Sequence, residues 1–174
     1  MTAAPDPVDH VTVPGGGAIG MVACPGGMQR FGADIRDIDE DLGRLKSWGA
    51  EGVVTLFERV EFDMLGVPDL PERALEAGFW WRHLPIRDMC APDEDFERSW
   101  IVEGAHLRDR LGAGARIVLH CWAGLGRTGT IAARLLVELG QSPDDAIRAV
   151  REAREGAIQS LQQELHVHAC RPVD

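Results

Sequence analysis

A short apolar segment that runs directly into a glycine-containing loop constrains the fold of this 174-residue chain more than any other feature. The segment Arg116–His120 has the length and apolar character of a strand inside a parallel sheet. The loop 121–127 contains two glycines, and residues 128–139 have the composition of a helix that Gly140 closes. A strand, a tight loop and a helix in immediate succession are typical of an α/β domain.

The rest of the chain also alternates between strand-like and helix-like patterns. We therefore predict a single α/β domain over residues 1–174, with a central, mostly parallel sheet flanked by helices. Residues 1–12 are expected to form a loose N-terminal arm, and residues 18–23 a short edge strand. Further strands are predicted at 53–57 and 79–84. Helices are predicted at 37–48, 58–65, 71–77, 93–111 and 160–170, and one more begins at Ser142.

The charge of the chain limits the partners that it can bind. Acidic residues outnumber basic ones by 28 to 18, which gives a formal net charge of −10. A surface with this charge repels nucleic acid and anionic lipid. No apolar run approaches the length of a membrane span, and the first residues do not have the pattern of a secretory leader. We therefore expect a cytoplasmic protein that binds neither nucleic acid nor membranes.

The loop after the strand Arg116–His120 has the composition of an anion-binding site. Free N–H groups at the start of a helix converge on one point, and the helix dipole adds partial positive charge there. Gly124 and Gly126 allow the loop to curl tightly, and Arg127 offers a forked guanidinium for further phosphate oxygens. We expect a phosphate dianion to be bound here by Trp122, Ala123, Gly124, Leu125, Gly126 and Arg127.

Cys121 stands at the start of this loop, in the same electrostatic field that favours phosphate. The field favours the thiolate form of the cysteine for the same reason. A thiolate beside a phosphorus atom is a nucleophile, so the pattern predicts a phosphocysteine intermediate. The hydroxyl of Thr128 can donate a hydrogen bond to the sulfur when the sulfur becomes the leaving group.

The run His-Cys-Trp-Ala-Gly-Leu-Gly-Arg-Thr-Gly-Thr at 120–130 resembles the signature loop of the protein tyrosine phosphatase superfamily. It is most similar to the compact dual-specificity and cyclin-dependent-kinase-inhibitor-type phosphatases. Leu-Pro-Ile-Arg-Asp at 84–88 resembles the segment that carries the general-acid aspartate of these enzymes. Gly-Ala-Ile-Gln at 156–159, followed by Gln163, is similar to their glutamine-bearing segment, and the resemblance covers residues 37–167.

The resemblance implies a phosphomonoesterase of the dual-specificity type that needs neither a metal ion nor a cofactor. Its substrate would be a phosphorylated protein or a small aryl or alkyl phosphate. Cys121 would attack phosphorus, while Asp88 protonates the leaving oxygen and later activates water. Gln163 would position that water, and His120 would orient the loop by hydrogen bonds.

The chain also departs from the family pattern. Arg-Glu-Gly at 154–156 stands where many relatives have Arg-Pro-Gly. The chain contains no tyrosine, so the tyrosine-lined clamp of the large tyrosine-specific enzymes is missing. The loop contains no lysine, although phosphatases of inositol lipids usually carry one there.

Two alternative functions remain open. One is a catalytically weak module that only binds phosphorylated partners, and the other is a phosphatase of a non-protein phosphate, such as an RNA 5′ end or a metabolite. The presence of Cys121, Arg127 and Asp88 counts against the binding module, because binding requires neither a thiolate nor an acid. The acidic net charge disfavours RNA.

Other suggestive residues receive plainer interpretations. Residues 15–20 match G-x-G-x-x-G by spelling, but they follow no clear strand and open no helix, so no dinucleotide site is predicted. His166 and His168 should point to different sides of a helix, so no metal site is predicted from this pair.

The four cysteines include no C-x-x-C pair, so reduced thiols are expected. Cys24 and Cys170 are expected to be inert. Cys90 lies two residues beyond Asp88, and we hypothesise that it traps the sulfenic acid of Cys121 as a disulfide under peroxide.

Overall fold

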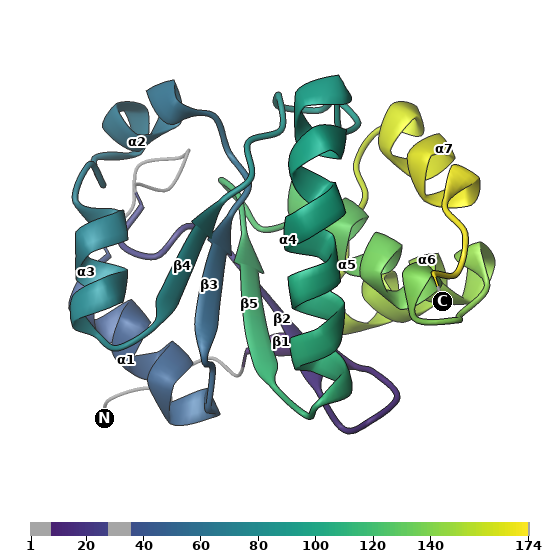
Figure 1. Ribbon diagram of the computed structural model, residues 1–174. Coiled ribbons are helices and arrows are strands. Elements are labelled where there is room, and N and C mark those ends of the chain that lie inside the picture. The colour runs from purple at the N-terminus through teal and green to yellow at the C-terminus, as the bar shows by residue number, and fades with distance from the viewer. Residues whose placement is uncertain (1–7, 28–35, 174) are drawn as a thin grey trace.

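A five-stranded sheet forms the centre of the computed structural model, which describes residues 8–27 and 36–173 (Figure 1). The order across the sheet is β1-β2-β5-β3-β4. β1 runs antiparallel to β2, whereas the pairs β2–β5, β3–β5 and β3–β4 are parallel. The mostly parallel sheet predicted from the sequence is therefore confirmed. The strands are β1 (Asp9–Thr12), β2 (Ala18–Val22), β3 (Gly52–Thr55), β4 (Trp80–His83) and β5 (Arg116–His120).

Two expectations about the N-terminal part of the chain are wrong. Residues 9–12, expected to belong to a loose arm, form β1 and pair in register from Asp9 with Met21 to Thr12 with Ala18. The segment 18–22 is consequently not an edge strand, because β2 lies between β1 and β5. Burial of Val11 in the main core holds β1 in place. Residues 1–7 of the expected arm lie outside the described residues.

Seven helices cover the sheet within the described ranges, and each predicted helix is among them. Four of the seven helices begin with a side-chain cap, because the side chains of Asp37, Asp93, Ser142 and Ser160 accept hydrogen bonds from backbone N–H groups. None of these helices is long and apolar enough to cross a membrane. The helices are α1 (Ile38–Trp48), α2 (Arg59–Leu65), α3 (Leu70–Glu76), α4 (Glu94–Gly112), α5 (Gly126–Glu138), α6 (Pro143–Ala153) and α7 (Leu161–Ala169).

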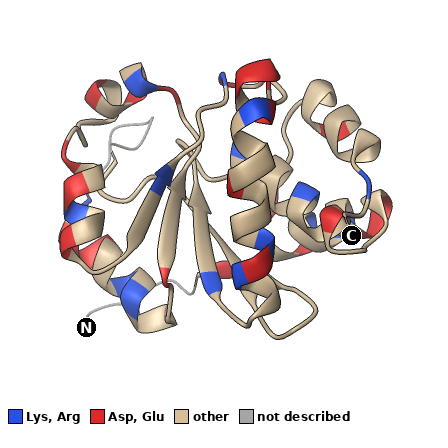
Figure 2. Ribbon diagram, viewed as in Figure 1, with Lys and Arg blue, Asp and Glu red and all other residues tan. Residues whose placement is uncertain are grey.

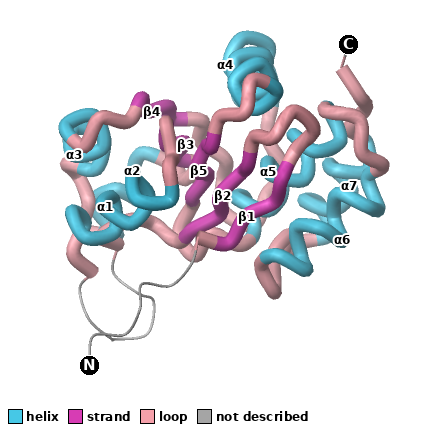
Figure 3. Tube along the Cα trace, turned by 90° about the horizontal axis from the view of Figure 1, so that it is seen from below, coloured by secondary structure: helices cyan, strands magenta, loops and turns pink. Residues whose placement is uncertain are grey.

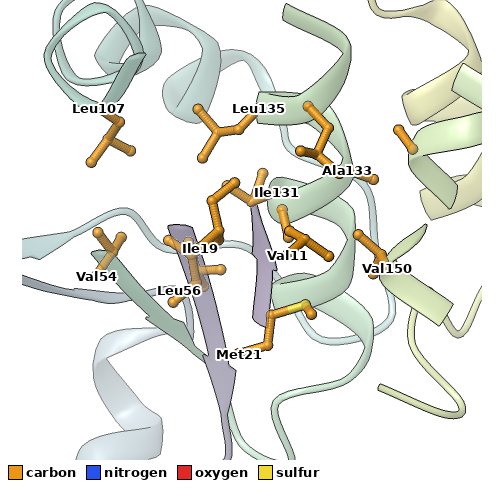
Figure 4. Close-up of a cluster of buried hydrophobic side chains, with 14 of the residues drawn as sticks. Val11, Ile19, Met21, Val54, Leu56, Leu107, Ile131, Ala133, Leu135 and Val150 are labelled. Carbon is orange, nitrogen blue, oxygen red and sulfur yellow. The ribbon is translucent and has the colours of Figure 1, made fainter. Parts of the chain in front are cut away.

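The side chains of the central strand β5 alternate between two hydrophobic clusters, one on each face of the sheet. Ile117 and Leu119 pack with α4–α7, whereas Val118 packs with α1–α3. Figure 3 shows these two groups of helices on opposite sides of the strands. In the larger cluster, Ile131 and Leu135 of α5 gather with apolar side chains of β1, β2 and β3 (Figure 4). Charged side chains lie mostly on the helices and loops, with acidic and basic ones interspersed (Figure 2).

The parallel strands determine where a site can form. The strands β2, β5, β3 and β4 all end at the same edge of the sheet, at the top of Figure 1. The loops that follow these strands therefore meet at this edge, as is usual for the binding sites of open α/β sheets. The sequence-predicted site residues Cys121 and Asp88 lie in two of these loops.

Candidate active site

Cys121 directly follows β5, a strand that is hydrogen-bonded on both sides, and its side chain is buried. The loop then turns back into α5, which begins at Gly126, two residues earlier than predicted. Gly124 has a φ of +70°, and a Cβ atom there would lie 2.1 Å from the carbonyl oxygen of Val22. Only glycine fits this close approach to the end of β2. Among the other loop residues, Trp122 and Leu125 are half-buried and Ala123 is exposed.

Arg127 is held deep in the site by a carboxylate that the sequence analysis missed. Its side chain is 1% exposed, and its two terminal nitrogens donate to the two oxygens of Glu61 at 2.6 and 2.8 Å. One of them also donates to the carbonyl of Ile86 at 3.1 Å. The other lies 3.3 Å from Oδ1 of Asp88. This forked pairing fixes the plane of the guanidinium and offsets its charge in a buried place.

A local signal for Glu61 exists in the sequence. Phe62 and Leu65 are the apolar residues of α2 that face the core, and Glu61 stands one turn before Leu65 on the same face. A carboxylate on the buried face of a helix needs a partner. The sequence does not reveal that this partner is Arg127, because the two residues lie on different elements.

Two neighbouring polar atoms at the start of α5 are buried and have no hydrogen-bond partner among the described residues. They are Nε of Arg127 and Oγ1 of Thr128. An unsatisfied buried donor costs about 1–3 kcal/mol, so such groups are rare and call for an explanation. Both residues were predicted to contact a phosphoryl group or the sulfur of Cys121. The unpaired donors therefore favour a site that binds a polar, anionic ligand.

His120 links the base of the loop to β3 and β4. Its Nδ1 lies 3.2 Å from the carbonyl oxygen of Cys121, so Nδ1 carries the proton and donates it. Its Nε2 accepts from the hydroxyl of Thr55 at 2.7 Å, and that oxygen accepts in turn from Nε1 of Trp81 at 2.9 Å. Burial lowers the pKa of His120 to about 4, which keeps the ring neutral near pH 7. This geometry suits a residue that orients the loop.

Asp88 and Asp93 have clearly different surroundings. Asp88 lies in the loop after β4, beside Arg127, with its side chain about half exposed. Asp93 caps α4, because its Oδ1 accepts from the N–H of Phe96 at 2.9 Å. Asp93 therefore serves the helix, and of these two carboxylates Asp88 is the one that reaches Arg127 in the described structure.

Gln163 is fully buried and is engaged in capping α7. Its Oε1 accepts from the N–H groups of Gln159 and Ser160 at 2.9 and 3.2 Å, and its Nε2 donates to the carbonyl of Cys90 at 3.4 Å. A Cβ atom added to Gly126 would lie 2.7 Å from Oε1 of Gln159 and 3.0 Å from Nε2 of Gln163. Both glutamines thus lie against the start of α5. The exposed Gln159 is a second candidate for the residue that positions the water, a role that the sequence analysis gave to Gln163 alone.

Two residues other than glycine adopt a left-handed conformation next to the site. Met89, with a φ of 60°, directly follows Asp88, and Ile158, with a φ of 61°, directly precedes Gln159. The N–H of Ile158 donates to the carbonyl of Leu125 in the loop at 3.2 Å. Such conformations are uncommon away from glycine and concentrate at functional sites.

The other cysteines have less reactive surroundings. Cys24 is buried, and burial together with the negative charge of Cys121 raises the pKa of its thiol. Burial raises the pKa of Cys170 to about 11. A raised pKa keeps both thiols protonated, which agrees with the expectation that they are inert. Cys90 is a free, half-buried thiol, and its redox role stays a hypothesis.

The remaining suggestive motifs lie away from the site. Gly15 and Gly16 form the turn between β1 and β2, with φ values of +94° and +89°, and they open no helix. His166 faces Arg134, whereas His168 is exposed. In residues 8–27 and 36–173, no group of three His, Cys, Asp or Glu side chains could hold a metal ion.

Comparison of the sequence with known proteins shows which family the chain belongs to. Residues 26–141 match the family described as a DSP-PTPase phosphatase of polymorphic toxin systems. The chain is also 34% identical to rat cyclin-dependent kinase inhibitor 3 over 157 residues, which is 88% of this chain and 71% of the rat protein. This chain belongs to the dual-specificity (DSP-PTPase) phosphatase family. It is therefore a cysteine-dependent phosphatase.

Two further similar proteins are also phosphatases by name. Bovine protein tyrosine phosphatase type IVA 3 is 32% identical over 120 residues, which is 68% of this chain and 63% of the bovine protein. The crystal structure of kinase associated phosphatase, with its catalytic cysteine replaced by serine, superposes with a TM-score of 0.76 at 30% identity. The superposition covers 87% of this chain and 84% of that one, so the phosphatase fold extends over nearly all of the sheet and helices described above.

Proposed function

We propose that this phosphatase hydrolyses phosphorylated protein, with Cys121 as the nucleophile and Asp88 as the general acid. The observation that carries the proposal is the buried cysteine that follows β5, close to a guanidinium that Glu61 anchors. The Nε of this guanidinium has no hydrogen-bond partner in the part of the chain that the structure describes. A thiolate and a forked cation that face the start of one helix suit a phosphate dianion.

The reaction proceeds in two steps. In the first, the sulfur of Cys121 forms a bond to phosphorus, the bond to the leaving oxygen breaks, and Asp88 gives its proton to that oxygen. In the second, a water molecule attacks phosphorus, the S–P bond breaks, and Asp88 takes up a proton from the water. The hydroxyl of Thr128 donates to the departing sulfur. Arg127 and the N–H groups of residues 122–126 bind the phosphoryl oxygens throughout.

The contact between Asp88 and Arg127 supports this sequence of events. Nη2 of Arg127 lies 3.3 Å from Oδ1 of Asp88. An arriving phosphate dianion would compete with Asp88 for the guanidinium, because both are anionic partners of Arg127. Substrate binding would thus release Asp88 from Arg127 and leave it beside the leaving oxygen.

We further propose that the chain is a single catalytic domain and that it acts in the cytoplasm. The proposal of a protein substrate rests on the names of the relatives and on the net charge. The names of two relatives refer to kinases, and that of a third refers to tyrosine phosphatase activity on protein. The net charge of −10 disfavours nucleic acid. A phosphorylated protein is therefore the substrate class we favour over an RNA end or a metabolite.

Turnover of an aryl phosphate in the presence of a metal chelator tests the proposal. The wild-type protein should hydrolyse the ester, and vanadate should inhibit it. Cys121→Ser should lose all but a few per cent of the activity and still bind a phosphopeptide, because Arg127 and the loop amides remain. Cys90→Ser is the matched control and should keep its activity. Full activity of a folded Cys121→Ser protein would contradict the covalent mechanism.

A further inference from the structure

Arg154 joins the signature loop to the edge strand β1. It is the residue that ends α6, and its side chain is 20% exposed. Its Nε donates to the carbonyl oxygen of Gly124 at 2.7 Å, and its Nη2 donates to that of Ala123 at 2.9 Å. Its Nη1 donates to Oδ2 of Asp9 at 2.6 Å. One guanidinium thus holds two consecutive carbonyls of the loop and a carboxylate of β1.

Holding these carbonyls also fixes two N–H groups of the loop. The peptide unit is planar and trans, so the carbonyl oxygen of one residue and the N–H of the next point in opposite directions. When Arg154 holds the oxygens of Ala123 and Gly124 on its own side, the N–H groups of Gly124 and Leu125 turn away from it. They then point toward the interior of the loop that Cys121 and Arg127 bracket.

We propose that Arg154, oriented by Asp9, is a positioning residue that aligns the Gly124 and Leu125 N–H groups for phosphoryl binding. This inference rests on the proposed function of the loop. Asp9 belongs to β1, which pairs with β2, and the end of β2 lies against Gly124. The β1–β2 pair therefore lies beside the loop, next to the Asp9–Arg154 ion pair. The Asp9–Arg154 pair therefore makes the edge strand part of the catalytic apparatus, although neither residue touches the substrate.

The choice of a forked cation at this place has a physical reason. The position of Gly124 requires a glycine, because its φ is +70° and its backbone lies against the end of β2. Glycine peptides rotate easily when nothing holds them, since glycine populates several backbone conformations. A planar guanidinium binds two acceptors in one plane and so holds both peptide units at once. A lysine has a single point charge and cannot do this.

The test uses the full chain with Arg154→Met, Arg154→Lys and Asp9→Asn. Arg148 lies in α6 and pairs with Asp145 at the surface, so Arg148→Met is the matched control. Vanadate inhibition, kcat and KM for an aryl phosphate, and thermal unfolding are measured for each protein. Arg154→Met should raise the vanadate inhibition constant about tenfold, the effect of losing roughly one hydrogen bond to a charged oxygen.

The variants should differ in a fixed order. Arg154→Met should also lower kcat about tenfold, because misplaced donors weaken transition-state binding. Arg154→Lys should recover only part of the loss, and Asp9→Asn should raise the inhibition constant by about threefold, since the amide keeps an acceptor oxygen but loses its charge. In the Arg154→Met background, Asp9→Asn should have no further effect, because Asp9 acts through Arg154.

The results separate this inference from the proposed function. Vanadate inhibition of folded Arg154→Met equal to that of the wild type would overturn the positioning role, as would an equal loss in Arg148→Met. If Arg154→Met does not fold, Arg154→Lys and Asp9→Asn carry the test with the same criterion. A wild-type protein that neither turns over the ester nor binds vanadate would instead contradict the proposed function.

Discussion

Arg127 and Arg134 lie on the same face of α5, and both side chains are almost fully buried, yet their guanidinium groups are satisfied differently. In Arg134, Nε donates to Glu138 at 2.8 Å, and the terminal nitrogens donate to both oxygens of Glu97 at 2.6 and 2.9 Å. In Arg127, the terminal nitrogens are paired but Nε has no partner among the described residues.

The difference suits a structural role for Arg134 and the proposed phosphate-binding role for Arg127. Arg134 also lies over the ring of Trp100, 4.7 Å from its centroid, and the ring nitrogen of that tryptophan donates to Glu138. This cluster connects α4 and α5, and each of the three guanidinium nitrogens of Arg134 has a protein partner. Arg127 combines a buried anchor, Glu61, with a half-exposed partner, Asp88, which we propose that a phosphate displaces. Variants of Asp88 and of the two arginines test this contrast, from the largest expected effect to the smallest.

Asp88→Asn should give the largest loss, because general acid catalysis contributes roughly 10²–10⁴ in rate. We expect kcat to fall by about that factor for an alkyl phosphate, and much less for a highly acidic phenol that leaves without a proton. The measurement is kcat for a series of esters with different leaving groups.

Asp93→Ala is the matched control for Asp88→Asn. It removes the cap of α4 and should lower the free energy of unfolding by about 0.5–2 kcal/mol. Its kcat should show no dependence on the leaving group beyond that of the wild type. A leaving-group-dependent loss in this variant, and not in Asp88→Asn, would reassign the acid to Asp93.

Arg127→Lys should lower kcat by about 10²–10³, which is the usual cost of removing a transition-state donor. Arg134→Lys keeps the charge in the same way but should leave kcat almost unchanged, because Arg134 contacts only structural partners. Single-turnover kinetics of the two folded variants make the comparison. Equal losses of kcat would remove the distinction between the two arginines.

Arg134→Met should affect stability instead of catalysis. It leaves the buried carboxylate of Glu138 with one cationic partner fewer, and breaking a buried ion pair costs about 3–5 kcal/mol. Arg108 and Trp100 still contact Glu138, which places the expected loss near the lower end of this range. Urea unfolding checks the value. A stability equal to that of the wild type would show that this cluster contributes little.

His120 should make the stability of the fold depend on pH. Its pKa is about 4 in the folded protein and about 6.5 in an unfolded chain, so the unfolded state binds the proton more tightly. Stability is then fully present above pH 6.5 and decreases by about 3 kcal/mol as the pH falls to 4. Urea unfolding between pH 4 and 7.5 should show a weaker slope for His120→Asn, whereas the exposed His168→Asn should follow the wild type. Parallel slopes for all three proteins would contradict this assignment.

The parts of the fold that the sequence predicts are those set by local patterns. Apolar periodicity and capping residues such as Asp93 and Ser142 are local, and the helices they mark are present with ends shifted by a few residues. The position of β2 inside the sheet is not local, because it depends on β1, a four-residue strand with one fully buried apolar side chain. A short edge strand of this kind has too few buried positions to show a clear alternation of apolar and polar residues in the sequence.

The same distinction applies to the site. Cys121, Arg127 and the loop glycines form one continuous motif, so their proximity follows from the chain itself. Glu61 and Arg154 reach the loop from α2 and from the end of α6, and only the tertiary structure brings them there. Gln163 was predicted from the resemblance as the residue that positions water. In the structure its side chain caps α7, and the resemblance did not indicate this contact.

The left-handed residues Met89 and Ile158 have a consequence for heat resistance. Such a conformation costs about 1–2 kcal/mol for a residue that carries a Cβ atom, and local unfolding releases that energy. Met89 is exposed and follows Asp88, the proposed acid, while the N–H of Ile158 donates to the carbonyl of Leu125 in the loop. The segments around the catalytic groups should therefore unravel at a lower temperature than the sheet. We expect heating to inactivate the enzyme before the strands β5 and β3 lose their protection against hydrogen exchange.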